Sequence, residues 1–226
     1  MKSMKKMKRK NRRIKYNEES YINKNYMVKE GTPIFPYEPI ITVRAKAIEA
    51  QLIETALLLA LNHQTLIATK AHRIKLAAKG RKVMEFGARR AHNFDAAYYG
   101  SRASYIGGVD STATVFAGKK FGIPIVGTMA HSFVQSYPTE YEAFVAYAKN
   151  YPDSCTVLLD TYDTINSGLQ NAIRLEKEYL IPNGYHLKGV RIDSGDIAYL
   201  SSQIRQILDE NDMKDTMIVA SNSLDE

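Results

Sequence analysis

Side chains able to bind phosphate, sugar hydroxyls or a metal ion follow each of five predicted strands in this sequence. In folds that alternate strands with helices, ligands bind beyond the carboxyl ends of the parallel strands. These side chains should therefore meet at one edge of a sheet. The segments are Gly87-Ala88-Arg89-Arg90, Gly127-Thr128-Met129-Ala130-His131-Ser132, Asp160-Thr161-Tyr162-Asp163-Thr164, Asp193-Ser194-Gly195-Asp196 and Ser221-Asn222-Ser223.

This combination of residue types suits the handling of a phosphate group or a sugar. Arginine and strand-end amides bind phosphate or carboxylate groups, and carboxylates hold ribose hydroxyls or contribute to an Mg²⁺ shell. A histidine acts as a base or as a nucleophile toward phosphorus. Each group also has a simpler interpretation, because aspartates cap helices, glycines form tight turns and a single histidine is often structural. Capping does not explain why such groups recur after every strand, so we predict a phosphate- or sugar-handling site.

The elements that would position these groups alternate along the chain. Such alternation predicts βα units with a parallel sheet, either part of a (β/α) barrel or an open doubly wound sheet. Five strands do not close a barrel of eight. A short strand at 39–43 and a long helix from about 48 to 80, with one bend, come first. The predicted strands then lie at 83–86, 123–126, 156–159, 189–192 and 217–220, and the predicted helices at 95–105, 111–121, 139–150, 164–180 and 196–211.

Charge is distributed unevenly over the 226 residues. The formal net charge is +7, but residues 1–30 hold 11 Lys or Arg and 3 acidic residues, so that the remaining body carries −1. The body therefore has no overall reason to bind a polyanion, and nucleic acid is not expected as its partner. The basic leader lacks the apolar stretch of a secretory signal, and being Lys-dominated and Ser-poor it fits a mitochondrial transit peptide badly.

Several other classes of protein are not expected. The longest apolar run, Ala56 to Leu61, is too short to span a bilayer. Cys155 is the single cysteine, which excludes an internal disulfide and a multi-cysteine metal site and indicates a reducing, cytoplasmic compartment. No phosphate loop, G-x-G-x-x-G fingerprint or zinc-binding histidine pair is present. No structural metal is predicted.

Several long motifs, in order, resemble those of nicotinate phosphoribosyltransferases. They include Glu85-Phe86-Gly87-Ala88-Arg89-Arg90, Gly127-Thr128-Met129-Ala130-His131-Ser132-Phe133, Leu159-Asp160-Thr161-Tyr162-Asp163-Thr164 and Val190-Arg191-Ile192-Asp193-Ser194-Gly195-Asp196. Upstream, Glu30-Gly31-Thr32-Pro33-Ile34-Phe35-Pro36, Glu49-Ala50-Gln51-Leu52-Ile53-Glu54-Thr55 and Thr65-Leu66-Ile67-Ala68-Thr69-Lys70-Ala71 extend the resemblance to about residues 29–226. It implies an α/β fold, part of an irregular, incomplete (β/α) barrel of the nicotinate/quinolinate phosphoribosyltransferase type.

The resemblance also implies a reaction and a role for each candidate residue. Members of this family convert nicotinate and phosphoribosyl pyrophosphate to nicotinate mononucleotide and pyrophosphate, with ATP hydrolysis coupled through a phosphohistidine. Nicotinamide or quinolinate are alternative substrates, and the loop at 127–132 favours nicotinate. The expected cofactors are Mg²⁺ and, as co-substrate, ATP. By resemblance His131 is the phosphohistidine; Thr128, Arg191 and Asp110 contact nicotinate; and Arg89, chosen over Arg90, binds phosphoribosyl pyrophosphate and Mg²⁺ with Asp160, Asp193 and Asp196.

The chain departs from the family in length, since full-length members are about twice as long. We expect three regions: a basic, disordered leader at 1–30, a lead-in segment with helices at 31–80, and a partial α/β barrel at 81–226. We expect a fragment whose activity requires a partner, either a second copy in a homodimer or a complementing C-terminal half. The alternative hypothesis is an inactive fragment whose basic leader binds nucleic acid or another polyanion.

Overall fold

The N-terminal part of the chain contains a strand where the sequence analysis predicted a disordered leader. The computed structural model describes residues 22–226, and β1 (Ile22–Met27) pairs antiparallel with β2 (Ile41–Val43). The leader prediction is therefore wrong for β1, because backbone pairing with β2 overrides its polar composition. Residues 1–21 of the leader, and with them most of the predicted polyanion-binding segment, lie outside the described residues.

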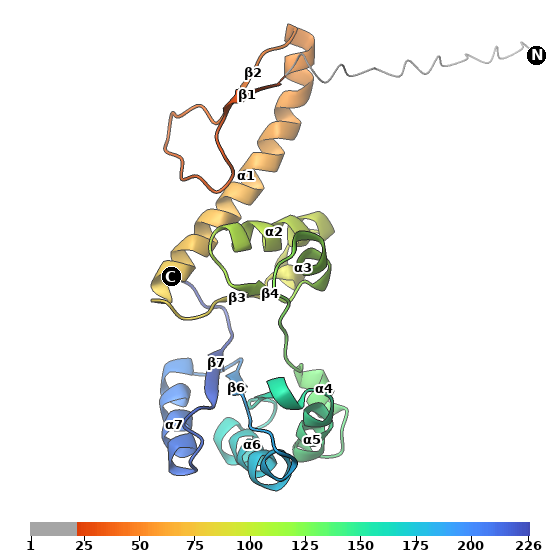
Figure 1. Ribbon diagram of the computed structural model, residues 1–226, viewed down its shortest axis with the longest axis vertical. Helices are drawn as coiled ribbons and strands as arrows, with labels where there is room; N and C mark the ends of the chain where they lie inside the picture. The colour runs from red at the N-terminus through yellow and green to blue at the C-terminus, as the bar shows by residue number, and fades with distance from the viewer. Residues whose placement is uncertain (1–21) are drawn as a thin grey trace, which may run out of the picture.

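A long helix, α1 (Ala47–Ala77), links this ribbon to the rest of the molecule. It runs through all 31 residues as one α-helix, where the sequence analysis expected a bend. The helix packs against α2 (Phe94–Ile106) in the middle tier of Figure 1. Gly107 permits this approach, since a Cβ built there would lie 2.4 Å from the Ala68 carbonyl oxygen. Only Ala71 of α1 is buried, while Leu52, Leu59 and Leu66 are exposed.

The middle tier contains the first parallel pair of strands, β3 (Met84–Glu85) and β4 (Ser111–Thr112). A 3₁₀ turn, η1 (Ala88–Arg90), follows β3, and α3 (Val115–Phe121) follows β4. Two predictions are wrong here. The helix expected from residue 111 begins at Val115, because the Thr112 backbone pairs with neighbouring strands, and the strand expected at 123–126 is reduced to one bridge between Thr112 and Ile125.

The lower tier holds a three-stranded parallel sheet in the order β5-β6-β7. Its strands are β5 (Thr156–Leu158), β6 (Gly189–Ile192) and β7 (Met217–Ala220), as the sequence predicted to within a residue. The helices are α4 (His131–Gln135), which was not predicted, α5 (Glu140–Asn150), α6 (Leu169–Leu175) and α7 (Ile197–Glu210). Short turns η2 (Pro152–Ser154) and η5 (Ile181–Asn183) complete the tier.

The helix predicted over 164–180 is α-helical only in its centre. Two π-helical segments, η3 (Thr164–Gly168) and η4 (Glu176–Leu180), flank α6. Helical caps match the sequence signals, because Thr139 accepts a hydrogen bond from the Glu142 amide at the start of α5. Segments of π-helix are common near functional sites, and η3 directly follows one of the predicted site segments.

The main hydrophobic core lies in the lower tier between the parallel sheet and its helices. It buries side chains of β5, β6 and the helices α5, α6 and α7, with Phe144, Leu158, Leu175, Ile192 and Leu208 among the largest. The α/β class is therefore confirmed. The parallel strands form two separate sheets in residues 22–226, and the incomplete (β/α) barrel stays a prediction. None of the helices in this range is long and apolar enough to cross a membrane.

The close approach of α1 and α2 gives a first prediction. Gly107→Ala should lower the free energy of unfolding by about 1–3 kcal/mol, because the added methyl group forces the Ala68 backbone aside. Gly100→Ala is the matched control, since a Cβ on that residue of α2 meets only His63, at 3.9 Å. Urea unfolding followed by circular dichroism measures both, and equal midpoints for the two variants would contradict the packing argument.

Candidate functional site

The candidate site is the edge formed by the carboxyl ends of β5, β6 and β7. The parallel pairing of these strands brings Asp160, Asp193 and Ser221 to the same edge. The loop after Ile125 crosses to it and contributes Thr128 and then His131, the first residue of α4. Four sequence segments predicted to converge therefore do so, through side chains that contact one another directly.

Arg191 lies at the centre of this edge. Its side chain is only 12% exposed, and its guanidinium contacts three segments of the chain. Nε donates to Ser221 Oγ at 2.7 Å, and Nη1 donates to Thr128 Oγ1 at 2.8 Å and to the Met129 carbonyl oxygen at 3.2 Å. Nη2 pairs with Asp193 Oδ1 at 3.2 Å. These contacts fix the guanidinium, and among the described residues one Nη2 N–H has no partner and is available to a ligand.

Asp193 joins Arg191 to His131. Its Oδ1 accepts a hydrogen bond from Ser221 Oγ at 2.7 Å, and its Oδ2 lies 3.5 Å from His131 Nε2. Burial alone would raise the pKa of Asp193, but the Ser221 hydrogen bond and the Arg191 charge outweigh burial and hold the pKa below its usual value. The carboxylate is therefore ionised at neutral pH.

His131 is accessible and held from both sides. Its side chain is 40% exposed, and Nδ1 lies 3.2 Å from Thr161 Oγ1. A carboxylate can only accept a hydrogen bond, so the tautomer with its proton on Nε2 suits the nitrogen that faces Asp193. In that tautomer Nδ1 can accept a hydrogen bond from the Thr161 hydroxyl. This arrangement orients the ring and places a negative charge beside it, as suits a histidine that becomes cationic during a reaction.

Asp160 ties the loop after β5 to the loop after β6. Its Oδ2 accepts a hydrogen bond from the Asp193 amide at 3.1 Å and another from the Ser194 hydroxyl. Its Oδ1 is buried and has no hydrogen-bond partner among the described residues. A buried carboxylate oxygen without a partner is costly, and a ligand donor or a cation would satisfy it.

Three of the candidate residues lie elsewhere or have a different contact. Asp110 is at the amino ends of β3 and β4, where its Oδ2 accepts hydrogen bonds from Lys75 Nζ at 2.6 Å and the Val83 amide at 2.7 Å. Asp196 Oδ1 accepts a hydrogen bond from the Tyr199 amide at 3.0 Å and so caps α7, which means that helix capping accounts for one of its two oxygens. Arg89 is exposed.

The neighbour of Arg89 reaches the site edge. Arg90 Nη1 donates to Ser223 Oγ at 3.2 Å, in the loop after β7.

Three residues make contacts that the sequence pattern did not predict: Thr161 with His131, Ser221 with Arg191, and Glu85 with two hydroxyl groups. Glu85 Oε2 accepts hydrogen bonds from Ser101 Oγ at 2.9 Å and Thr112 Oγ1 at 2.6 Å. An acidic residue inside a predicted strand was the signal for Glu85, whereas nothing local marks Thr161 or Ser221 as partners.

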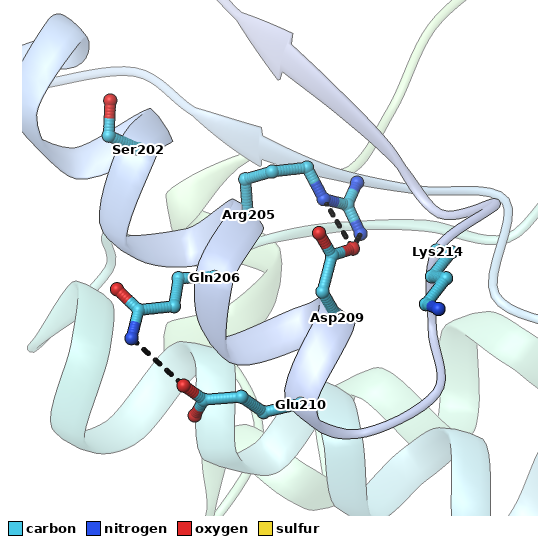
Figure 2. A pocket seen from close by; sticks show the side chains of 6 residues that line it. All are labelled: Ser202, Arg205, Gln206, Asp209, Glu210 and Lys214. Carbon is cyan, nitrogen blue, oxygen red and sulfur yellow. Dashed lines mark hydrogen bonds and ion pairs between the residues drawn. The ribbon is translucent and has the colours of Figure 1, made fainter.

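A second hollow lies on α7 and does not share these groups. It is lined by Ser202, Arg205, Gln206, Asp209, Glu210 and Lys214 (Figure 2). Arg205 pairs with Asp209 and also donates to the Thr216 and Met213 carbonyl oxygens, at 2.8 Å each. The arginine therefore stabilises the turn that leads into β7 and is not free for a ligand.

The parallel sheet and its polar edge define an α/β protein with a candidate site at the carboxyl ends of its strands. The model of the nicotinate phosphoribosyltransferase (NAPRTase) family matches residues 81–226. The chain belongs to this family. Its relatives include the nicotinate phosphoribosyltransferase of Bacillus subtilis, which is 52% identical over 201 residues, covering 89% of this chain and 40% of the relative. The corresponding protein of Dictyostelium discoideum is 38% identical over 89% of this chain and 42% of its own length.

Solved structures give the same result. Human nicotinic acid phosphoribosyltransferase superposes with a TM-score of 0.81 at 32% identity, covering 88% of this chain and 51% of that one. Nicotinate-nucleotide pyrophosphorylase from Pyrococcus furiosus gives a TM-score of 0.79 at 29% identity, with the same coverage. The chain spans about 40% of the length of the curated relatives it matches.

The contacts of Asp110 give a second prediction. The Lys75 hydrogen bond, aided by the Val83 amide, lowers the pKa of Asp110 in the folded protein. A group with a lowered folded pKa stabilises the fold above its unfolded pKa, about 3.9, and this contribution is lost as the pH falls through the folded value. Asp110→Asn should therefore lose less stability than wild type on acidification below about pH 5.

The size of the Asp110 effect should be modest, because the side chain is 38% exposed and solvent screens the pair. We expect a cost below about 1 kcal/mol at neutral pH. Urea unfolding at pH 7, 5 and 3.5 measures it, with Asp153→Asn, at an exposed carboxylate in η2, as control. Parallel pH profiles for wild type and Asp110→Asn would refute the assignment.

Proposed function

We propose that this chain carries out nicotinate phosphoribosyl transfer in the salvage of nicotinate for NAD biosynthesis. The observation that carries the proposal is the contact network of Arg191, Asp193 and His131 at the carboxyl edge of the sheet, in a chain of this family. The reaction joins the nicotinate ring nitrogen to C1 of phosphoribosyl pyrophosphate. The C1–oxygen bond breaks, and pyrophosphate leaves with its electron pair. The single cysteine supports the cytoplasm as the place of the reaction.

Arg191 and Thr128 suit the recognition of nicotinate. A planar guanidinium binds a carboxylate better than an ammonium does. Arg191 is held in place, and one of its Nη2 N–H groups has no partner in the part of the chain that the structure describes. Thr128 Oγ1 lies 2.8 Å from the guanidinium, so a carboxylate bound there would contact both side chains. A fixed positive charge favours nicotinate over nicotinamide, whose amide is neutral.

The carboxylates at the edge suit the phosphoribosyl substrate and Mg²⁺. Magnesium ions in such sites take one or two protein carboxylates and complete their shell with phosphate oxygens and water, and the unpartnered Oδ1 of Asp160 meets that need. We assign Asp160, Asp193 and Asp196 to ribose and to Mg²⁺, which supplies charge neutralisation of the pyrophosphate leaving group. Arg89 is proposed to bind the same substrate, with Arg90 as the alternative that contacts the edge.

The side chains at the edge must stabilise the positive charge that develops on the sugar during the reaction. Departure of pyrophosphate builds positive charge on the ribose ring, and fixed negative groups beside it lower the barrier. Asp160 and Asp193 are held by backbone and hydroxyl donors, so they need no rearrangement when that charge develops. Arg191 holds the nucleophile in line for the same step.

We further propose that His131 couples the reaction to ATP as a phosphohistidine. An unprotonated ring nitrogen would attack the γ-phosphorus, the bond to the β-phosphate oxygen would break, and ADP would leave. The ring becomes cationic, and the neighbouring Asp193 carboxylate stabilises that charge. Water later hydrolyses the N–P bond and releases phosphate. The 40% exposure of the His131 side chain supports access by a nucleotide.

Full activity is proposed to require polypeptide beyond these residues, from a second copy or a complementing C-terminal half. The exposed leucines of α1 support this proposal, because apolar side chains exposed along one helix commonly mark a surface that another polypeptide covers. The test uses the full chain with labelled nicotinate, phosphoribosyl pyrophosphate, Mg²⁺ and ATP. A second arm replaces the matching segment of the Bacillus subtilis relative with this chain. Absence of nicotinate mononucleotide in both arms would refute the proposal.

ATP coupling has its own prediction. His131→Ala should abolish ATP-stimulated product formation and ATP hydrolysis, while slow, ATP-independent transfer persists. We expect the stimulated rate to fall at least about a hundredfold, as for loss of a catalytic nucleophile or base. His186→Ala is the matched control, because His186 precedes β6 at the opposite end of the sheet. Unchanged stimulation in His131→Ala would contradict the role.

A further inference from the structure

A glycine behind the site edge sets the position of the loop after β5. A Cβ built on Gly168, the last residue of η3, would lie 1.9 Å from the Leu159 carbonyl oxygen and 2.6 Å from the Leu159 carbonyl carbon. Gly168 has an ordinary helical conformation, φ −56°, so glycine is required for space and not for backbone strain. The Leu159 amide also donates to the Arg191 carbonyl oxygen at 3.0 Å. Leu159 is thus held between β6 and η3.

A buried carboxylate contacts the same segment through Ser167, the residue before Gly168. Glu140, the first residue of α5, is 5% exposed. Its Oε2 accepts hydrogen bonds from Ser167 Oγ at 2.6 Å and Asn171 Nδ2 at 2.9 Å, whereas its Oε1 is buried without a partner among the described residues. An apolar side chain would pack here without burying an unpaired oxygen. The carboxylate therefore fixes one particular register of η3 and α6 against α5.

These two contacts bracket the hydrogen bond between His131 and Thr161. His131 begins α4, which packs against α5, and Thr161 lies three residues before η3. The contact of Glu140 with Ser167 joins α5, which packs on the α4 helix of His131, to η3, which follows Thr161. Gly168 lets η3 pack directly on Leu159, two residues before Thr161, and Leu159 is hydrogen-bonded to Arg191 in β6. Displacement of η3 must therefore move Thr161 relative to His131.

We propose that Glu140 and Gly168 are positioning residues for His131, acting through η3 and Thr161. The catalytic part of this inference rests on the proposed coupling of ATP to His131. The positioning of the His131 ring does not depend on that coupling, so it can be measured in the full chain without turnover. The added methyl group of Gly168→Ala and the lost acceptor of Glu140→Ala should each release the Thr161 hydroxyl from Nδ1.

The test records the ¹⁵N chemical shifts of the His131 ring nitrogens in the labelled full chain. Thr161→Ala defines the shift of Nδ1 without its partner. Gly168→Ala and Glu140→Ala should move Nδ1 toward that value, whereas Glu140→Gln, which keeps an oxygen acceptor for Ser167 and Asn171, should stay near wild type. Gly100→Ala is the control for a glycine-to-alanine change in an open helical position. Wild-type Nδ1 shifts in folded Gly168→Ala and Glu140→Ala would overturn the proposal.

Two further measurements keep the outcome decisive. If circular dichroism shows that Gly168→Ala or Glu140→Ala does not fold, Ser167→Ala replaces that variant, because it removes one donor to Glu140. A wild-type Nδ1 shift in Ser167→Ala would also overturn the proposal. In the activity assay, Glu140→Ala should lower ATP-stimulated kcat by about ten- to a hundredfold, with the KM for nicotinate unchanged. If the variants show altered ring shifts but the wild-type chain shows no activity, the proposed function is refuted and the positioning role is not.

Discussion

The guanidinium of Arg191 is the constraint on which the rest of the site depends. A cation that is nearly buried must have its charge and its donors satisfied. Arg191 meets this requirement with Asp193, Ser221, Thr128 and the Met129 carbonyl, which come from three separate segments of the chain. The same contacts lower the pKa of Asp193 and leave it ionised next to His131. One buried positive charge thus sets the shape of the edge and the electrostatics of its histidine.

The parallel sheet explains why residues so far apart in sequence share this site. Each strand of the β5-β6-β7 sheet ends at the same edge, and β5 and β6 are each followed by a loop and by helices that cover the core. The close contact at Gly168 and the buried Glu140 extend this order behind the edge, where η3 replaces a regular helical turn. The core therefore does more than stabilise the fold, because it determines the distance between the histidine and its threonine partner.

The sequence predicted the lower tier better than the middle tier for a physical reason. Strands β5, β6 and β7 are short apolar runs bounded by polar turns, and the caps Thr139 and Asp196 are local signals that need only a few residues. In the middle tier, β4 has two residues, and its pairing with β3 and the Ile125 bridge is decided by contacts across the chain. The helix pattern after residue 111 is strong, but the Thr112 backbone satisfies its hydrogen bonds in the sheet instead.

The family, the α/β class and the residue types at each strand end can be read from the sequence. Which of these residues meet depends on how the chain packs. Packing brought Thr128, His131, Asp160, Arg191 and Asp193 together, placed Asp110 at the opposite ends of the strands beside Lys75, and gave the contact with Ser223 to Arg90. Motifs and caps are local and can be read along the chain, whereas the hydroxyl and carbonyl partners of Arg191 lie 30 to 63 residues away and are set by packing.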